Sequence, residues 1–546
     1  MAFTATELLV RADALKTDRG NWESMWQEIA DNLFGRRNFI SSITPGLKRN
    51  SRIYDSTAFR SNELMASMLY SLLTDIESRW FTLSLEDTDR MDHPDAIAWL
   101  EGATNQMLIA YSRQGANFAP QAHEMLFDTV GFGTGGMFIQ DEPGSGPVFS
   151  SRPLGELYIS ENIAGIVDTV FRRFELTARQ ADELFETTPR AAAKAIEDGK
   201  WEDKAEYIHA VLPNPDLVLG NLDFTGMPFI SYHIDMTEKD FIDQPKGFWQ
   251  MPFLTPRWEK DAGELYGRGP GVVALSDAIM LNQMSRTSLK GAQKAVDPPG
   301  YIPNDGILSN LNFQPGGMTI VDANLMARMG GLPIVHQPQT ANIGLGVEME
   351  NRRQASIEAD FYADIIQMFK DPRMTATQVV ELVRQSSRIL SPVIGRQRNE
   401  YLEPNLDRVF DIELRGGRLP PIPEVLSGQN VKVDYVSPVS RAAKAEESRS
   451  ISGVIGQAIE VSQVDPTVLD NFDLDLAFRE IAGNADIPSR IMRDPRIVQA
   501  LREQRAQEQA QREQLALMNE AGQTAARLLP ASAKAAQINQ ETAASA

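Results

Sequence analysis

The chain has 546 residues, more than one compact core usually supports, so we expect several lobes or one elongated subunit. It contains no cysteine, which excludes disulfides, thiolate metal sites and a cysteine nucleophile, and which fits assembly in a reducing cytoplasm. A formal charge of -21 argues against a protein that grips nucleic acid by neutralising many phosphates, although an acidic balance also serves solubility alone.

Neither an export signal nor a membrane span is predicted. The N-terminus MAFTATELLVRADALKTD carries charges throughout its apolar positions, and no later apolar run reaches the roughly 18 residues that a membrane helix needs. We therefore expect a soluble protein that is not exported and has no membrane partner.

The N-terminal part is predicted to consist of helices and short strands. Apolar residues recur at three- and four-residue steps over residues 4–34, which predicts a helix. A second helix follows with Ser56 as a candidate cap and leads into the strand RWFTLSL. The pattern is helical again from about 95 to 130 and ends at GFGTGG, Gly131 to Gly136, before the strand-like MFIQ. A phosphate-binding loop leaves a strand and opens a helix, so this glycine cluster is interpreted as a turn.

Short β-rich runs dominate residues 137–258, with proline, glycine and asparagine between them. One helix is expected among them, beginning at Thr177 in TARQADELF. Because the β runs do not alternate regularly with helices, a largely antiparallel sheet is favoured over a parallel one. The predicted fold class is α+β.

Two long helices with an irregular insert follow. The first comes after YGRGPG, Tyr266 to Gly271, and extends to about 296, and the second runs from about 343 to 369. The glycines of YGRGPG lack the Lys-Ser/Thr of a nucleotide loop, and Pro270 removes a backbone donor. They are therefore interpreted as a tight, close-packed start to the first helix.

The remainder is helical apart from one strand. A helix capped by Thr375 is expected to kink at Pro392 and Pro404, and the strand VKVDYV follows. Helical segments then run from 441 to about 483 and from Pro495 onward. The last helix has too little apolar surface to bury alone, so either neighbouring copies share it or it is frayed. The final residues, about 20 of them, are expected to be disordered.

The sequence offers no catalytic, metal-binding or cofactor-binding site. The histidines form neither HxH nor HExxH, and their separations in sequence give no reason to bring them together. No GxSxG nucleophile elbow occurs. The histidines are His93, His123, His209, His233 and His336.

The order of elements resembles that of a portal protein, the head-to-tail connector of a short-tailed (podovirus-type) bacteriophage. The resemblance covers nearly the whole chain, and its landmarks are specific because they occur in this order. They are RIYDST at Arg52, RWFTLSL at Arg79, YGRGPG at Tyr266, MTATQVVE at Met374 and LRGGRLPPIP at Leu414.

The resemblance implies a portal-type elongated subunit with an α/β wing, two long stem helices, a small clip insert and a helical crown or barrel. The implied boundaries are the first part of the wing at 1–270, a stem helix at 271–296, the clip at 297–342, a second stem helix at 343–369, a channel loop and long kinked wing helix at 370–440, a crown at 441–494, and a C-terminal barrel helix with a disordered tail at 495–546.

In the portal family a ring of subunits, usually twelve, encloses a channel at one capsid vertex, through which double-stranded DNA is packaged and ejected. The resemblance thus implies a homo-oligomeric ring at the head-tail junction of the virion, assembled in the host cytoplasm. Its implied partners are double-stranded DNA, the terminase motor, the major capsid and scaffolding proteins and the tail adaptor protein. A mostly acidic wall with few cations should let DNA move in either direction.

Three cations are candidates to face the channel. Arg286, Lys290 and Lys294 recur at four-residue steps and so lie along one face of the first long helix. If that helix lines the channel, they form stacked rings that touch passing phosphates. Alternatively, they offset the helix dipole, remain solvated or pair with acids of the second long helix. The acids available for such pairing are Glu350, Glu358 and Asp360.

A charged segment after the second long helix lies where the family has a loop that projects into the channel. A plain turn between two helices is the alternative. The segment consists of Lys370, Asp371, Pro372, Arg373 and Met374.

Two other functions remain open at this point. A scaffold or internal virion protein without a channel would use the acidic charge and polar helices equally well. A nucleotide-dependent enzyme that uses one of the glycine clusters is a remote alternative.

Overall fold

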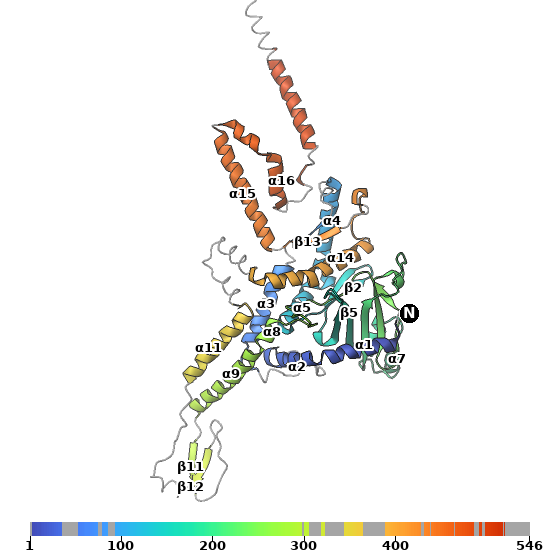
Figure 1. Ribbon diagram of the computed structural model, residues 1–546, viewed down its shortest axis with the longest axis vertical. Helices are drawn as coiled ribbons and strands as arrows, with labels where there is room; N and C mark the ends of the chain where they lie inside the picture. Colours follow the sequence, from blue (N-terminus) through green and yellow to red (C-terminus); the bar gives the residue numbers. More distant parts are fainter. Residues whose placement is uncertain are drawn as a thin grey trace, which may run out of the picture. The chain divides into compact units, whose positions relative to one another are not determined.

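The computed structural model is drawn in Figure 1, and the chain divides into two compact units. The first unit comprises Met1–Glu86, Gly102–Pro421 and Asn430–Glu447, and the second comprises Asp87–Glu101, Ile422–Gln429 and Ser448–Ala546. The structure describes residues 3–34, 53–74, 79–85, 93–297, 300–304, 318–322, 343–363, 388–426, 431–436, 438–463, 465–484, 491–493, 497–516 and 518.

The predicted N-terminal helix is present in three pieces: α1 (Ala5–Asp18), α2 (Gly20–Ile29) and a π-helical turn at Ala30–Phe34. Thr4 and Glu7 form a reciprocal capping box at the start of α1. The break between α1 and α2 falls at Arg19, a buried residue whose guanidinium donates to three backbone carbonyls of residues 154–157.

Helix α3 (Thr57–Leu73) begins directly after Ser56, as expected, but the cap is a different side chain. The Ser56 hydroxyl accepts no capping hydrogen bond. Instead, the Asp55 carboxylate accepts from the Thr57 N–H at 2.8 Å. The sequence therefore located the start of the helix correctly and assigned its cap to the wrong neighbour.

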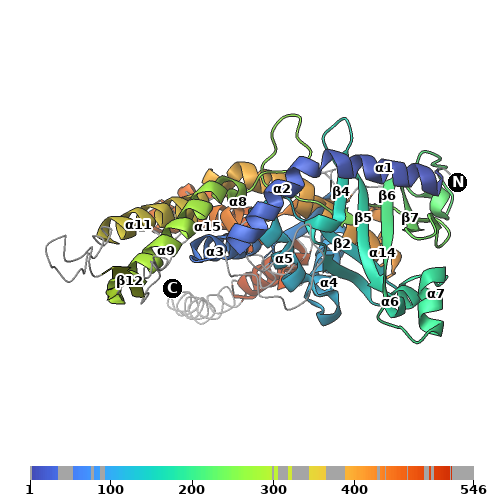
Figure 2. The same ribbon diagram turned by 90° about the horizontal axis from the view of Figure 1, so that it is seen from below.

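A six-stranded antiparallel sheet forms the largest β structure and confirms the predicted pairing mode. Helix α1 packs against one face of this sheet, where Leu8 and Ala12 join a core that includes Phe171, Ile208 and Tyr232 (Figure 2). The strands are β4 (Leu157–Glu161), β5 (Val167–Thr177), β6 (Lys204–Pro213), β7 (Phe229–Asp235), β8 (Asp240–Phe241) and β9 (Lys246–Phe248).

Two helices, not the single one expected, interrupt the strands. The first, α6 (Ala178–Leu184), is capped by Thr177 as predicted. The second, α7 (Arg190–Glu197), was missed. Eight residues are too few to show a helical period clearly, and packing of Ala192 on an aromatic cluster around Phe185 stabilises the helix.

A smaller three-stranded sheet is formed by β10 (Phe253–Leu254), β2 (Met137–Glu142) and β3 (Gly146–Ser151) in that order. Helices α4 (Pro94–Ser112) and α5 (Phe118–Phe132) precede it in the chain and confirm the helical pattern of this region. Two predicted strands that lie far apart in the sequence pair with each other. They are β1 (Phe81–Leu85) and β13 (Val431–Tyr435), and they are antiparallel.

The first long helix is divided into α8 (Pro270–Val273) and α9 (Leu275–Val296), and the second is α11 (Ile343–Asp360). The sequence predicted that the second helix continues to 369. It ends at Asp360, and Tyr362 then adopts a φ of 56°, a left-handed conformation that cannot continue an α-helix. Between α9 and α11, the described residues form a parallel pair, β11 (Gly300–Asn304) and β12 (Met318–Asp322).

The predicted irregularity at Pro404 is present. Residues 388–397 are helical through Pro392, a π-helical turn follows at Arg398–Leu402, and α14 (Glu403–Arg415) carries Pro404 in its first turn. Thr375, the expected cap, lies outside the described residues.

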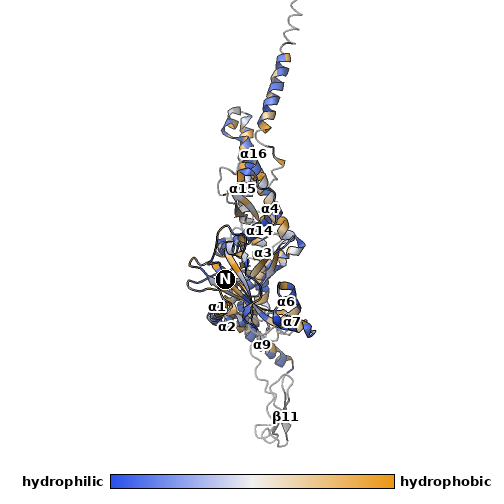
Figure 3. Cartoon of the chain, turned by 90° about the vertical axis from the view of Figure 1, so that its right-hand side faces the viewer, coloured by the Kyte–Doolittle hydropathy of each residue, from blue (hydrophilic) through white to orange (hydrophobic). Residues whose placement is uncertain are grey.

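The C-terminal region is helical, as the sequence predicts. It contains α15 (Pro438–Ser462), a 3-10 helix at Pro466–Asn471, α16 (Leu474–Asn484) and a helix at 497–516 whose side chains are nearly all exposed. Figure 3 shows hydrophobic and hydrophilic residues interspersed along these helices. Within the part of the chain that the structure describes, no helix is long and apolar enough to span a bilayer.

Candidate functional site: the paired helices α9 and α11

Helices α9 and α11 run antiparallel and pack against each other (Figure 1). The Ser288 hydroxyl donates to the Glu350 carboxylate, and Arg353 Nη1 binds Asp277 Oδ1 at 2.8 Å. These two contacts lie at different levels of the pair, and they fix the register between the helices. Gly346 supports the close approach, because a Cβ there would lie 3.2 Å from the Ser288 hydroxyl oxygen.

Asn282 attaches α9 to the N-terminal part of the chain. Its Oδ1 accepts from the N–H groups of Tyr54 and Asp55 at 2.9 and 3.1 Å, and its Nδ2 donates to the Asn32 carbonyl at 3.1 Å. The side chain is buried beside Leu281. Because the buried Asn282 amide forms all three of these hydrogen bonds, it holds α9 in one position. The signal in the sequence was a polar residue on the otherwise apolar inner face, and it was missed.

The three candidate cations of α9 follow the buried Asn282 at four-residue steps along the helix. Arg286 and Lys290 are exposed and Lys294 is partly exposed. The Arg286 guanidinium lies 5.8 Å from the centre of the Tyr54 ring, a cation-π contact. Among the residues that the structure describes, neither Glu350 nor Asp360 forms an ion pair with any of them.

Acidic side chains of α9 and α11 contact residues other than the three cations. Glu350 accepts from Ser288, as described above, and the carboxylate of Asp277 binds Arg353. Burial, together with the nearby charge of Asp277, raises the pKa of Asp360. Within the described residues, none of Asp277, Glu350 and Asp360 therefore pairs with the three cations.

The two glycine clusters of the sequence pack directly on each other at the base of α9. A Cβ on Gly133 would lie 2.2 Å from the Gly267 carbonyl oxygen, and one on Gly271 would lie 2.2 Å from the Gly131 carbonyl oxygen. The Gly267 N–H donates to Thr134 Oγ1 at 2.9 Å. The space over the YGRGPG glycines is thus filled by backbone, which leaves no room there for a phosphate. We call this contact the glycine joint.

Arg257 links the glycine joint to the kinked helix. Its side chain is 1% exposed and contacts Glu400 and Glu161, each at 2.8 Å, and the backbone carbonyls of Gly165 and Leu265. Burial opposes the charge of Arg257, but hydrogen bonds and ion pairs with the two carboxylates outweigh it and raise the pKa of the guanidinium. The arrangement is a structural clamp between segments that lie far apart in the sequence.

The second candidate set, Lys370 to Met374, lies outside the described residues. The structure describes the chain up to Ala363 on one side and from Arg388 on the other. These five residues therefore keep the status of a sequence prediction.

The expectation that the histidines stay apart is wrong for one pair. His209 and His233 face each other on β6 and β7, with stacked rings whose centres lie 4.3 Å apart. His209 Nε2 lies 2.9 Å from Ser231 Oγ. The pairing of β6 with β7 brings the two histidines together. The spacing of residues within one strand does not reveal which residue of another strand lies opposite.

Both rings are held in the neutral form. Burial, followed by the neighbouring His233, depresses the pKa of His209 well below its usual value. Burial also lowers the pKa of His233 to about 4, and the nearby Asp243 opposes this only in part. Two neutral imidazoles could serve as metal ligands, but within the described residues no group of three or more His, Cys, Asp or Glu side chains is placed to hold an ion.

Comparison with known proteins identifies the class of protein. A family model described as bacteriophage head to tail connecting protein matches residues 5–492. The chain therefore belongs to this family.

Individual relatives share most of their length with the chain. It is 28% identical over 541 residues to the portal protein of Salmonella phage epsilon15, covering 97% of this chain and 96% of the relative. It is 29% identical over 533 residues to the probable portal protein of Bordetella phage BPP-1, covering 95% and 94%. A chain from the virion of a native gene transfer agent particle aligns over 79% of this chain and 88% of its own length, with 12% identity and a TM-score of 0.37.

Proposed function

We propose that this protein is the portal protein of a short-tailed bacteriophage. Its copies form a ring-shaped channel at the capsid vertex, through which double-stranded DNA is packaged and ejected and by which the head is joined to the tail. The observation that carries the proposal is the match of nearly the whole chain to head-to-tail connecting proteins and to two phage portal proteins.

In this proposal the helices have assigned roles. Helices α9 and α11 are the stem, residues 297–342 the clip, the sheets and helices of residues 1–270 and 370–440 the wing, and residues 441–494 the crown. The helix at 497–516 joins its equivalents in a barrel. Its almost fully exposed side chains support this role, because such a helix gains stability mainly from neighbours.

We further propose that α9 lines the channel with Arg286, Lys290 and Lys294. The support is that Arg286 and Lys290 are exposed, and that within the described residues neither Glu350 nor Asp360 pairs with any of the three cations. Three isolated cations per subunit, in a chain of net charge -21, give brief phosphate contacts without the tight binding that would stop DNA movement. The segment from Lys370 to Met374 would project into the same channel.

The partners and the location follow from this role. The ring, which we expect to contain twelve subunits, would contact the terminase motor during packaging, the major capsid and scaffolding proteins during assembly, and the tail adaptor afterwards. It would assemble in the host cytoplasm and remain at the portal vertex of the virion.

Negative-stain microscopy of the purified full chain tests the ring. Annular particles with a central hole are expected. A protein that remains a compact monomer at every concentration tested would refute the proposal.

Replacement of Arg286, Lys290 and Lys294 by Gln tests the channel lining. Rings should form normally, because these side chains make no described ion pair, while the salt dependence of DNA packaging or ejection becomes flatter as phosphate contacts are lost. The control replaces Arg352, an exposed arginine of α11 that pairs with Glu348, by Gln. A triple variant whose DNA transport has the wild-type salt response would exclude these residues from the channel wall.

A further inference from the structure

The loop that joins β6 to β7 displays apolar side chains to solvent. Leu219 and Leu222 are 87% and 90% exposed. Between them, Gly220 adopts a φ of 97°, and the Asn221 N–H donates to the Val218 carbonyl at 3.3 Å, which closes a tight turn. Three residues span at most about 11 Å, so the two leucines lie close together. We call these leucines and the turn between them the apolar tip.

Hydrogen bonds within the loop hold the tip in one conformation. The Nδ2 of the buried Asn214 donates to three backbone carbonyls of the loop, at 3.2, 3.3 and 3.0 Å, which belong to Phe224, Thr225 and Met227. The Val218 N–H donates to the Thr225 carbonyl at 2.9 Å. Phe224 also packs against the core that α1 shares with the sheet. Because the loop is already ordered, a partner that covers the leucines loses little conformational entropy on binding.

The charge next to the apolar tip is negative. The exposed Asp216 and Asp223 flank it in the sequence, and no lysine or arginine occurs from 214 to 228. A membrane surface of anionic lipids would repel these carboxylates, so a protein is the favoured partner. The combination of exposed leucines and carboxylates fits an apolar groove with cationic side chains at its edge.

The sheet that carries the apolar tip lies at the opposite end of unit 1 from α9 and α11. In Figure 2, β7 lies beside the N-terminus, and the two long helices lie at the other end of this unit. Phe3 and Phe224 pack against the same core, so the loop lies close to the N-terminus as well. If α9 lines the channel, as proposed above, this end of the unit points away from the channel axis. The tip then faces whatever surrounds the ring.

We propose that the apolar tip attaches the ring to the capsid shell, and that Leu219 and Leu222 of each copy enter an apolar, basic-edged groove of the major capsid protein. This inference rests on the proposed function, because it names the surface that the portal protein presents to the shell. A scaffolding protein that acts during assembly would leave the leucines uncovered afterwards. A permanent partner keeps them buried, which is the more stable arrangement for two such exposed side chains.

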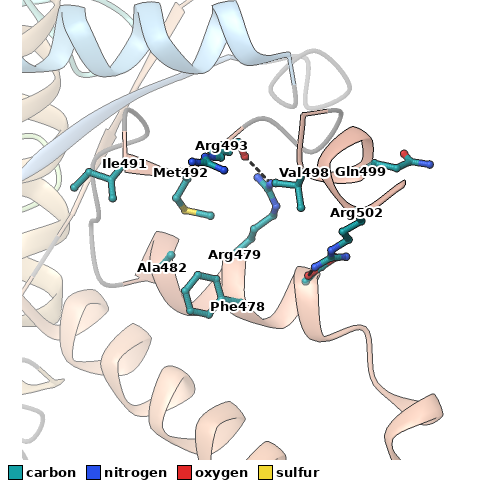
Figure 4. A pocket seen from close by; sticks show the side chains of 10 residues that line it. Phe478, Arg479, Ala482, Ile491, Met492, Arg493, Val498, Gln499 and Arg502 are labelled. Atoms are coloured by element: carbon teal, nitrogen blue, oxygen red, sulfur yellow. Dashed lines mark hydrogen bonds and ion pairs between the residues drawn. The ribbon is translucent and has the colours of Figure 1, made fainter. Parts of the chain in front are cut away.

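A second copy of the chain is the alternative partner for the apolar tip. Its unit 2 contains a pocket of about 670 Å³ whose apolar lining includes Phe478 and Met492, on facing sides of the pocket in Figure 4. The lining also contains the Asp475 carboxylate, which binds Arg502 at 2.7 Å and lies near Arg479. Because this carboxylate offsets part of the positive charge, the pocket fits the two aspartates beside the tip less well than a groove whose cations are unpaired.

Co-expression of the full chain with the major capsid and scaffolding proteins of the same phage tests the attachment. The test variant combines Leu219→Ser with Leu222→Ser, and its rings should form normally because both side chains are exposed. We expect at least a fivefold drop in the number of rings per purified shell, measured on quantitative gels. Leu219→Met combined with Leu222→Met keeps the tip apolar and should retain the wild-type number. Ile163→Ser is the control, because Ile163 is fully exposed on a different loop, between β4 and β5.

A photoreactive benzoylphenylalanine at position 222, irradiated in purified shells, identifies the partner. We expect an adduct with the major capsid protein. An adduct with the scaffolding protein, an adduct between copies of this chain, or no adduct would overturn the inference. Equal numbers of rings per shell for the serine variant and wild type would also overturn it, and would leave the portal role standing. A wild-type chain that forms no ring, or whose rings never enter shells, would remove both the attachment and the portal role.

Discussion

Replacement of Arg257 by Met should destabilise unit 1 strongly. The Arg257 side chain is 1% exposed and pairs with Glu400 and Glu161, whose side chains are 18% and 24% exposed. Removal of the guanidinium takes one partner from each of two largely buried carboxylates, although Glu161 keeps Lys260 and Glu400 keeps Arg396. Breaking a fully buried pair costs about 3 to 5 kcal/mol, so partial exposure of the two acids suggests a loss of about 2 to 4 kcal/mol.

The matched control is Arg352→Met on α11. Arg352 also pairs with a glutamate, Glu348, at 2.6 Å, but the two side chains are 76% and 59% exposed. Exposed pairs of this kind contribute no more than about 0.5 kcal/mol. The same chemical change is thus expected to have effects that differ several-fold, because Arg257 is buried and has more partners than the exposed Arg352.

Thermal and urea unfolding, both at one protein concentration, measure the two effects. For a unit of this size a loss of 1 kcal/mol lowers the midpoint by roughly 1 °C, so Arg257→Met should unfold about 2 to 4 °C below wild type. Arg257→Lys should fall between them, because it keeps the charge and loses the forked geometry. Equal unfolding midpoints for Arg257→Met and Arg352→Met would refute the reasoning.

Three further predictions concern stability. Gly271→Ala should destabilise the protein by about 1 to 3 kcal/mol, because the new Cβ would lie 2.2 Å from backbone. Gly291→Ala, where α9 has open space, should stabilise the protein by roughly 0.5 to 1 kcal/mol. Equal urea unfolding midpoints for the two variants would contradict the packing of the glycine joint. The depressed pKa of His233, about 4, means that the unfolded chain binds the extra proton, so stability falls as pH drops below about 6.5, by about 2 kcal/mol at pH 5. His233→Phe should flatten that slope, and an unchanged slope would assign it to other groups. Asp55→Ala should lower the free energy of unfolding by about 1 kcal/mol and Ser56→Ala hardly at all, and the reverse order would restore Ser56 as the cap.

Local patterns predicted local structure well in this chain. The strands between residues 137 and 258, the helix capped by Thr177 and the break at GFGTGG all lie where alternation, capping residues and glycine indicated. The interpretation of YGRGPG as a tight start to a helix is also confirmed. Each of these features is decided by residues within a few positions of one another, so a single sequence contains the information.

Contacts between distant segments were not predictable in the same way. The meeting of the two glycine clusters, the Arg257 clamp and the stacking of His209 on His233 join residues from 24 to more than 130 positions apart. No spacing rule connects such residues, because the fold of the whole unit brings them together. Asn282 is an intermediate case, since a polar residue on an apolar face does signal a buried partner without saying which.

The paired helices combine a rigid base with surfaces that remain uncovered further out. At the base, the glycine joint and Arg257 fix the direction of α9 through contacts within one chain. Along the helices, Leu289 and Leu345 are 50% and 56% exposed, which a lone subunit would not favour. A subunit whose orientation is set internally can present such side chains to a neighbour at a constant angle, and a constant angle is what closes a ring. Changes at the base should therefore alter the stability of the single chain, while changes at Leu289 or Leu345 should weaken assembly and leave the folding of the isolated chain intact.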